Sequence, residues 1–193
     1  MTIELEHVTK RYGDKTILDD LTLDLSTDTS YLVTGESGCG KTTLLRILMG
    51  LEKPDEGRIR LLGDYKYTWL SCGVVFQDDR LIESLSAVRN VSVIRKLTSD
   101  KAAREELEKL LPPDIPDLPV RELTSVQRRM VCLVRAFSVP ADILLLDEPF
   151  TGMEERERSM ALAFIKEHKG STPLVVASSD AAGMEVYKTV RLS

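Results

Sequence analysis

Residues Gly35 to Thr42 read Gly-Glu-Ser-Gly-Cys-Gly-Lys-Thr and satisfy the pattern G-x-x-x-x-G-K-[ST]. Glycines let a backbone turn so tightly that successive N–H groups point inward at phosphate oxygens. Lys41 adds a full positive charge for the β- and γ-phosphates, and the Thr42 hydroxyl is a suitable ligand for Mg²⁺. We therefore predict a site for Mg²⁺ and a nucleoside triphosphate, ATP, formed by Gly35, Glu36, Ser37, Gly38, Cys39, Gly40, Lys41, Thr42 and Thr43.

A glycine-rich turn with an unrelated lysine is the alternative explanation of this segment. The flanking residues disfavour it. Residues 31–34 read as a short buried strand that leads into Gly35, and residues 42–49 read as a helix that ends at Gly50. A phosphate-binding loop needs this order of strand, loop and helix, because the helix adds its partial positive end to the site.

A second acidic element follows an apolar run, Ile-Leu-Leu-Leu, at residues 143–146. A buried strand would project Asp147 from its carboxyl end, where open α/β sheets bind ligands. We predict that Asp147 holds Mg²⁺ through water and that Glu148 polarises the attacking water as general base, so that Glu148 and Lys41 are the catalytic residues. Taken alone, Asp-Glu-Pro after a strand is equally compatible with a helix cap and a turn.

The remaining elements must position these two segments. Residues 1–25 alternate apolar and polar side chains on either side of a Gly-Asp turn, which predicts two antiparallel strands at an edge. Buried strands are also predicted at 74–76 and 174–177, and helices at 101–111, 124–137 and 159–168. Alternating helices and buried strands favour an α/β fold with a mostly parallel sheet covered by helices.

Composition limits the possible function classes. The chain has 193 residues, of which 42% are hydrophobic and 30% charged, so it fits one soluble globular domain. The net charge of −5 predicts no basic surface for nucleic acid, and the apolar runs are too short for a membrane span. No secretory signal is visible, and we interpret the three cysteines as reduced thiols of a cytosolic protein.

Together these residues resemble the nucleotide-binding subunit of ATP-binding-cassette (ABC) transporters over nearly the whole chain. Tyr12, in Lys-Arg-Tyr-Gly, matches the aromatic residue that stacks on adenine in that family. Gln77, in Val-Val-Phe-Gln, matches the glutamine that contacts Mg²⁺ and links the site to a helical lobe. Residues 133–136 and 140–150 follow the family pattern, and residues 76–81 are similar to importers of nitrate, sulfonates and taurine. An ordinary turn aromatic and a polar strand end are the alternatives for Tyr12 and Gln77.

The resemblance implies a P-loop NTPase fold in one domain, residues 1–193, with an antiparallel β edge at the N-terminus and a helical lobe inserted at roughly 78–137. It implies an ATPase subunit that moves a transmembrane permease, which would dock through the region Gln77–Ser92. A second ATP-binding subunit would complete the site, as a homodimer or heterodimer. The expected location is cytoplasmic, peripheral on the inner face of the cell membrane.

Three segments depart from the family pattern. Residues 123–127 read Leu-Thr-Ser-Val-Gln where the family has Leu-Ser-Gly-Gly-Gln, and Val126 should crowd the approach of the partner's γ-phosphate. Glu154 stands where the family has Asp, and Ser179 stands where it has a histidine that contacts the γ-phosphate. We therefore predict tight ATP binding with slow hydrolysis.

Two other functions compete with a transport subunit. The altered segments favour a regulatory nucleotide-binding module, largely non-hydrolysing, that pairs with another ATPase subunit. A cytosolic kinase uses the same phosphate loop, but it has no obvious role for Gln77 or for the helix that contains Arg128 and Arg129.

Overall fold

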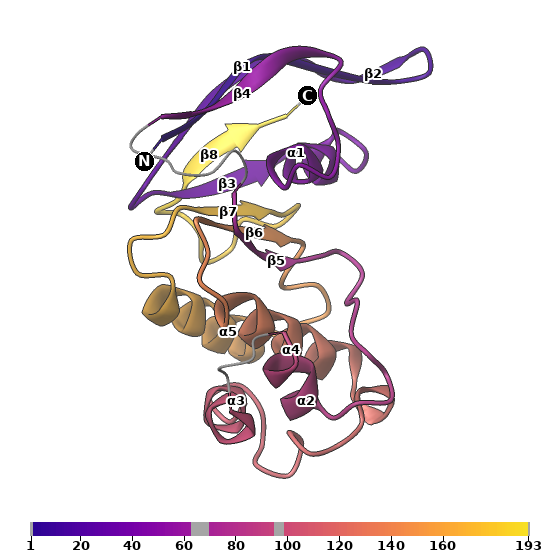
Figure 1. Cartoon of the computed structure of the whole chain (residues 1–193), viewed down its shortest axis with the longest axis vertical. Helices are drawn as coiled ribbons and strands as arrows, with labels where there is room; N and C mark the ends of the chain where they lie inside the picture. Colours follow the sequence, from indigo (N-terminus) through magenta and orange to yellow (C-terminus); the bar gives the residue numbers. More distant parts are fainter. Residues whose placement is uncertain (1, 63–69, 95–98, 193) are drawn as a thin grey trace.

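Two sheets form the framework of the protein in the computed structural model, which describes residues 2–62, 70–94 and 99–192 (Figure 1). The smaller sheet is antiparallel, with three strands in the order β2-β1-β4. The larger sheet is parallel, with five strands in the order β5-β6-β7-β3-β8. The strands are β1 (Thr2–Tyr12), β2 (Lys15–Ser26), β3 (Ser30–Thr34), β4 (Glu56–Leu62), β5 (Cys72–Val75), β6 (Ile143–Asp147), β7 (Leu174–Ala177) and β8 (Lys188–Arg191).

Helices cover both faces of the parallel sheet. Helix α1 (Lys41–Leu48) lies between the two sheets, and α4 (Ser125–Phe137) and α5 (Glu155–His168) cover the opposite face (Figure 1). Two shorter helices, α2 (Ala87–Ser92) and α3 (Asp100–Leu107), pack beyond α4, and Val120–Glu122 forms a 3₁₀ turn. No helix among the described residues is both long and apolar enough to cross a membrane.

Strand β6 shows how the core holds these layers together. All of its residues are buried. Ile143 and Leu145 pack with α1 and the antiparallel sheet, whereas Leu144 and Leu146 pack with the helices of the other face. Because side chains alternate along a strand, an unbroken apolar run is what a strand buried on both faces requires. The strand therefore fixes the position of Asp147, its last residue.

The predicted fold class, a P-loop α/β architecture with a parallel core sheet, is confirmed, and the structure adds that the antiparallel strands form a separate sheet. The strands β4 and β8 and the helix α2 were not predicted. Helix α5 begins four residues earlier than expected, because Glu154 and Glu157 form a reciprocal capping box at its start. Strand β5 ends at Val75, one residue before the expected end, and α3 ends at Leu107 rather than at residue 111.

The predicted helical lobe at roughly 78–137 contains α2, α3 and α4. Residues 95–98 of that range lie outside the described residues. Its status as an inserted lobe, and the single domain 1–193, stay predictions.

Candidate functional site

The loop from Gly35 to Thr42, which we call the phosphate loop, leaves the carboxyl end of β3 and enters α1. Gly40 is the N-cap residue of this helix and has a φ of 103°. A Cβ at this position would lie 2.8 Å from Cγ2 of Ile17, so both conformation and space demand glycine. The loop therefore presents backbone N–H groups and the helix N-terminus to one side of the site.

Lys41 occupies the centre of the phosphate loop, with only 8% of its surface exposed. Its ammonium donates hydrogen bonds to the carbonyl oxygens of Gly35 at 2.8 Å and of Glu36 at 3.2 Å. A buried ammonium needs such partners because desolvation penalises its charge. The ammonium is thus held against the backbone at the start of the phosphate loop.

Thr42 and Asp147 meet at the junction of α1 and β6. The Thr42 hydroxyl donates to Oδ2 of Asp147 at 2.7 Å, although the two residues are 105 positions apart in the sequence. Asp147 is 4% exposed, and burial raises the pKa of its carboxyl, while the bond from Thr42 acts in the opposite direction. The two side chains present adjacent oxygen ligands, which suit a hard cation such as Mg²⁺.

Among the described residues no group of three or more His, Cys, Asp or Glu side chains forms a complete metal site. Mg²⁺ is commonly bound by one or two protein oxygens together with substrate phosphates, and the Thr42 hydroxyl and the Asp147 carboxylate supply two such oxygens. The residues present therefore fit a magnesium ion that arrives with its nucleotide.

Glu148 has an unusual backbone conformation, with a φ of 45°. Its carboxylate accepts a hydrogen bond from the Ser179 backbone N–H at 3.0 Å and one from the Ser178 hydroxyl at 3.3 Å. A left-handed conformation costs free energy in a residue other than glycine and persists where the surroundings enforce it. In this conformation the Glu148 carboxylate reaches the two residues that follow β7.

A single cavity of about 200 Å³ brings most predicted site residues together. Its lining comprises the predicted residues Tyr12, Ser37, Gly38, Gly40, Lys41, Thr42, Thr43, Gln77, Asp147 and Glu148, with Ile17 in addition. Gly35, Glu36 and Cys39 line a neighbouring cavity instead, together with the start of β2 and with Arg191 and Leu192. Ile17 was not predicted; it follows the β-turn at Gly13 and packs over the loop, and no sequence motif identifies it.

Tyr12 stands at the mouth of this cavity with 46% of its surface exposed. Its hydroxyl donates to Glu52, which also forms an ion pair with Arg46 of α1. The ammonium of Lys10 lies 5.5 Å from the centre of the ring. The ring is therefore anchored at its hydroxyl end, while much of its surface remains available for stacking.

Gln77 is held through its backbone by Arg129, which was not among the predicted site residues. Arg129, buried in α4, donates to the carbonyl oxygens of Phe76 at 2.6 Å and of Gln77 at 2.8 Å. It also pairs with Asp79 at 3.3 Å. The sequence did carry one sign of this role: Arg129 stands next to the apolar Met130 in a predicted helix. A buried arginine requires hydrogen-bond acceptors such as backbone carbonyls.

The altered segment 123–127 forms the start of α4. Thr124 is the N-cap, and its side chain and that of Gln127 exchange hydrogen bonds with each other's backbone in a capping box. The side chain of Val126 lies near Gly152, where a Cβ would be 3.8 Å away. Thr124 and Gln127 therefore have a structural role within this chain, and the expected crowding by Val126 stays a prediction.

Comparisons with known proteins agree with this arrangement. The family model for ABC transporters matches residues 18–151. A probable sulfate/thiosulfate import ATP-binding protein CysA of Chlorella vulgaris is 34% identical over 205 residues, which cover 100% of this chain and 87% of the relative. The taurine import ATP-binding protein TauB of Pseudomonas aeruginosa is 40% identical over 157 residues, which cover 77% of this chain and 60% of the relative.

A solved structure extends the agreement to three dimensions. The dimeric ATP-binding cassette MJ0796, in a post-hydrolysis state bound to ADP and Pi, matches with a TM-score of 0.85 at 25% identity, over 99% of this chain and 94% of that chain. Family model, relatives and fold lead to one assignment. The chain belongs to the ABC transporter family, as an ATP-binding subunit.

Proposed function

We propose that this chain binds Mg-ATP and couples its binding and slow hydrolysis to the movement of a membrane permease in an import system. The observation that carries this proposal is the cavity in which the phosphate loop, the Thr42–Asp147 pair and Glu148 meet. The names of the relatives, which are import ATP-binding proteins for sulfate or taurine, support the transport class. In such systems the permease or a binding protein selects the imported substrate.

Each binding residue has a proposed role that its surroundings support. Lys41 and the backbone N–H groups of the phosphate loop bind the β- and γ-phosphates, and the ring of Tyr12 stacks on adenine. Thr42, Asp147 and Gln77 hold Mg²⁺, directly or through water. The cation, when bound, neutralises charge on the phosphate oxygens.

Glu148 is the proposed general base. The Ser179 N–H binds Oε1 of the carboxylate and the Ser178 hydroxyl binds Oε2, so each oxygen accepts one hydrogen bond and keeps a lone pair for an attacking water. A histidine side chain at position 179 would add a direct contact to the γ-phosphate, which the shorter serine does not reach. Since one such transition-state contact can be worth several kcal/mol, we expect slow turnover.

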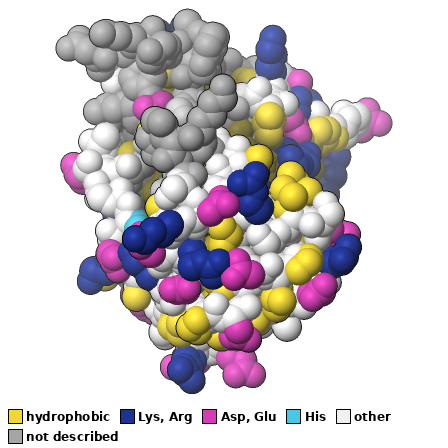
Figure 2. All heavy atoms as spheres, turned by 60° about the horizontal axis from the view of Figure 1, so that its bottom comes forward, with side chains coloured by type: hydrophobic (Ala, Val, Ile, Leu, Met, Phe, Trp, Pro, Cys, Tyr) yellow, Lys and Arg dark blue, Asp and Glu magenta, His cyan; other side chains and the backbone are white. Residues whose placement is uncertain are grey.

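We propose that the permease docks on the region Gln77–Ser92, where a helical lobe at roughly 78–137 begins. Its shape is fixed by Asn90, whose side chain binds the backbone N–H and carbonyl of Ile82 and the carbonyl oxygens of Leu85 and Ser86. Ile82 is 49% exposed. Figure 2 shows this end of the molecule, where hydrophobic side chains lie among neighbouring basic and acidic ones. Such a mixed face suits a protein partner better than nucleic acid.

A second ATP-binding subunit is the other proposed partner, as in the dimeric cassette to which the chain is similar. In that arrangement residues 123–127 of one subunit would face the phosphate loop of the other. Docked on a permease, the pair would lie at the inner face of the cell membrane.

The experiment that tests the proposal measures ATP affinity and turnover in parallel, for the wild-type chain, Glu148→Gln and Ser179→His. We expect all three to bind ATP with similar affinity, Glu148→Gln to lose turnover, and Ser179→His to gain about tenfold or more in kcat. ATP binding without any turnover, even in Ser179→His, would instead favour the regulatory module. Absence of ATP binding would reject both functions.

A further inference from the structure

The loop that follows β7, residues 178–183, contains the two groups that hold Glu148, and we call it the β7 loop. Ser178 is 3% exposed. Its hydroxyl donates to Glu148 and accepts a hydrogen bond from the Asp180 N–H at 3.2 Å. With its single proton directed at the carboxylate, the hydroxyl can point in only one direction. The orientation of Glu148 thus depends on the conformation of the β7 loop.

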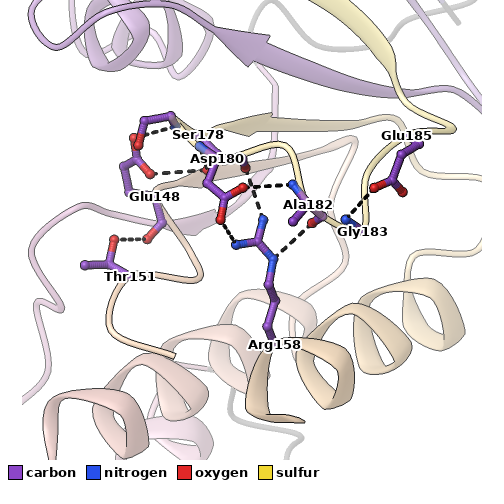
Figure 3. A network of polar contacts seen from close by, with 9 residues as sticks. Glu148, Thr151, Arg158, Ser178, Asp180, Ala182, Gly183 and Glu185 are labelled. Carbon is purple, nitrogen blue, oxygen red and sulfur yellow. Dashed lines mark hydrogen bonds and ion pairs between the residues drawn. The ribbon is translucent and has the colours of Figure 1, made fainter. Parts of the chain in front are cut away.

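One guanidinium group fixes this loop (Figure 3). Arg158, in the second turn of α5, pairs with the Asp180 carboxylate and donates to the Asp180 carbonyl at 3.1 Å and to the Ala182 carbonyl at 3.0 Å. Its three donor nitrogens thus bind three acceptors of one loop. The remaining Asp180 oxygen accepts from the Ala182 N–H at 2.9 Å, which closes the turn.

The same guanidinium group also contacts the segment that contains Glu148. The Arg158 Cζ atom lies 4.9 Å from the centre of the Phe150 ring, which is buried two residues after Glu148. The Arg158 side chain is only 14% exposed, whereas that of Asp180 is 63% exposed. A planar, largely buried fork of donors is better suited to fix a loop than a single exposed ion pair.

We propose that Arg158 is a positioning residue for Glu148: it binds the β7 loop and the Phe150 segment together, so that the Ser178 hydroxyl and the Ser179 N–H hold the carboxylate in one orientation. This inference rests on the proposed role of Glu148 as general base. Arg158 does not line the nucleotide cavity, so it acts through the loop rather than on ATP.

The test compares Arg158→Met and Arg158→Lys with Arg156→Met, an exposed arginine two positions earlier in α5 that has no ion pair or hydrogen bond among the described residues. Arg158→Met should lower kcat by about 10- to 100-fold, because small displacements of a catalytic group have effects of this size. The KM for ATP should stay within about twofold. The kcat of Arg158→Lys should lie between those of Arg158→Met and wild type, since one ammonium cannot reach all three acceptors. The kcat of Arg156→Met should equal that of wild type.

A double variant separates positioning from a general structural role. In the Glu148→Gln background, Arg158→Met should cause no further loss of turnover, because the carboxylate that it positions is already gone. An equal loss in both backgrounds would overturn the proposal, and so would a parallel loss of ATP affinity. Circular dichroism confirms that each variant is folded.

A measurement without turnover keeps this test independent of the proposed function. Amide hydrogen exchange of Ser179, followed by ¹⁵N NMR, reports the bond from its N–H to Glu148. We expect Arg158→Met to speed this exchange about tenfold or more and Arg156→Met to leave it unchanged. If Glu148→Gln left turnover unchanged, the proposed base would be wrong, yet the exchange rate would still decide whether Arg158 orders the loop. Unchanged exchange in folded Arg158→Met would refute the positioning role.

Discussion

The phosphate loop and the β7 loop leave the carboxyl ends of two adjacent parallel strands, but they are stabilised in opposite ways. The phosphate loop is held by its own backbone: glycine conformations, the start of α1 and one lysine that binds carbonyl oxygens inside the loop. The β7 loop is held by side chains, above all by Arg158 from a helix that covers the opposite face of the sheet.

This difference separates the two parts of the proposed function. Binding of phosphates depends on a local structure that one short segment builds almost alone. Orientation of the general base depends on contacts among α5, the β7 loop and the residues after β6, which are distant in the sequence. A substitution in this second part can therefore reduce hydrolysis while ATP binding persists.

The largest predicted effect tests the phosphate loop directly. Lys41→Met should weaken ATP binding by about 100- to 1,000-fold, because it removes the charge-assisted bonds to two phosphates from a poorly solvated position. Isothermal titration at fixed Mg²⁺ concentration measures this loss. The fold should persist, since the buried ammonium is replaced by an apolar chain of similar length.

Lys101→Met is the matched control for this charge, because Lys101 lies on the exposed face of α3 and pairs only with Glu105 at 3.9 Å among the described residues. It should leave ATP affinity within about twofold of wild type. If both variants lost affinity equally, the effect would come from net charge, and the phosphate loop would not be the binding site.

Two glycines with positive φ allow the cost of an unfavourable backbone conformation to be separated from the cost of steric crowding. Gly50 has a φ of 70° with open space around it, whereas Gly40 has a φ of 103° and is crowded by Ile17 and Leu18. Gly50→Ala should lower the free energy of unfolding by about 1 kcal/mol, and Gly40→Ala by about 1–3 kcal/mol more. Urea unfolding measures both. Equal losses would show that the phosphate loop can shift to admit a methyl group, and thus that its structure is not rigid.

The phosphate loop and β6 were predictable because their physical causes are local. Glycine at fixed spacing, a lysine and an unbroken apolar run each leave a direct mark in the sequence. The short α2 and the strand β8 leave weaker marks: only six residues form α2, and β8 reads Lys-Thr-Val-Arg, with charges at both ends. Their structure depends on tertiary contacts that no short pattern encodes.

Arg129 and Arg158 show the same limit at the level of the site. Both bind backbone carbonyls of segments far away in the sequence. Since every residue has a backbone carbonyl, the residue type of the acceptor gives no pattern that could be recognised in the sequence. Ser179 was recognised as a departure, whereas the bond from its N–H to Glu148 was not predicted, because it depends on the left-handed φ of Glu148.

Tyr12 offers a smaller test, at the edge of the phosphate loop. Tyr12→Ala should weaken ATP binding by about 5- to 10-fold through lost stacking, while the affinity for tripolyphosphate stays unchanged. Competition against a fluorescent ATP analogue measures both ligands. Glu52→Gln, which keeps a hydrogen-bond acceptor for the Tyr12 hydroxyl, should cost no more than about twofold. An equal loss of tripolyphosphate affinity would mean that Tyr12 stabilises the phosphate loop and does not stack on adenine.

The smallest predicted effect is on the β7 loop and depends on pH. The N–H of Ala182 and the Arg158 charge lower the pKa of Asp180, so the carboxylate contributes stability above its unfolded pKa of about 3.9 and loses it as the pH falls through the lower folded value. Since Asp180 is largely exposed, wild type should exceed Asp180→Asn in stability by less than about 1 kcal/mol at pH 7, and this difference should shrink as the pH falls below the unfolded pKa of about 3.9. Thermal unfolding across this range measures it. A stability difference that stayed constant with pH would assign the effect of Asp180→Asn to packing. If this difference closed in acid while the stability difference between wild type and Gly40→Ala stayed constant, acid would weaken the β7 loop and spare the phosphate loop.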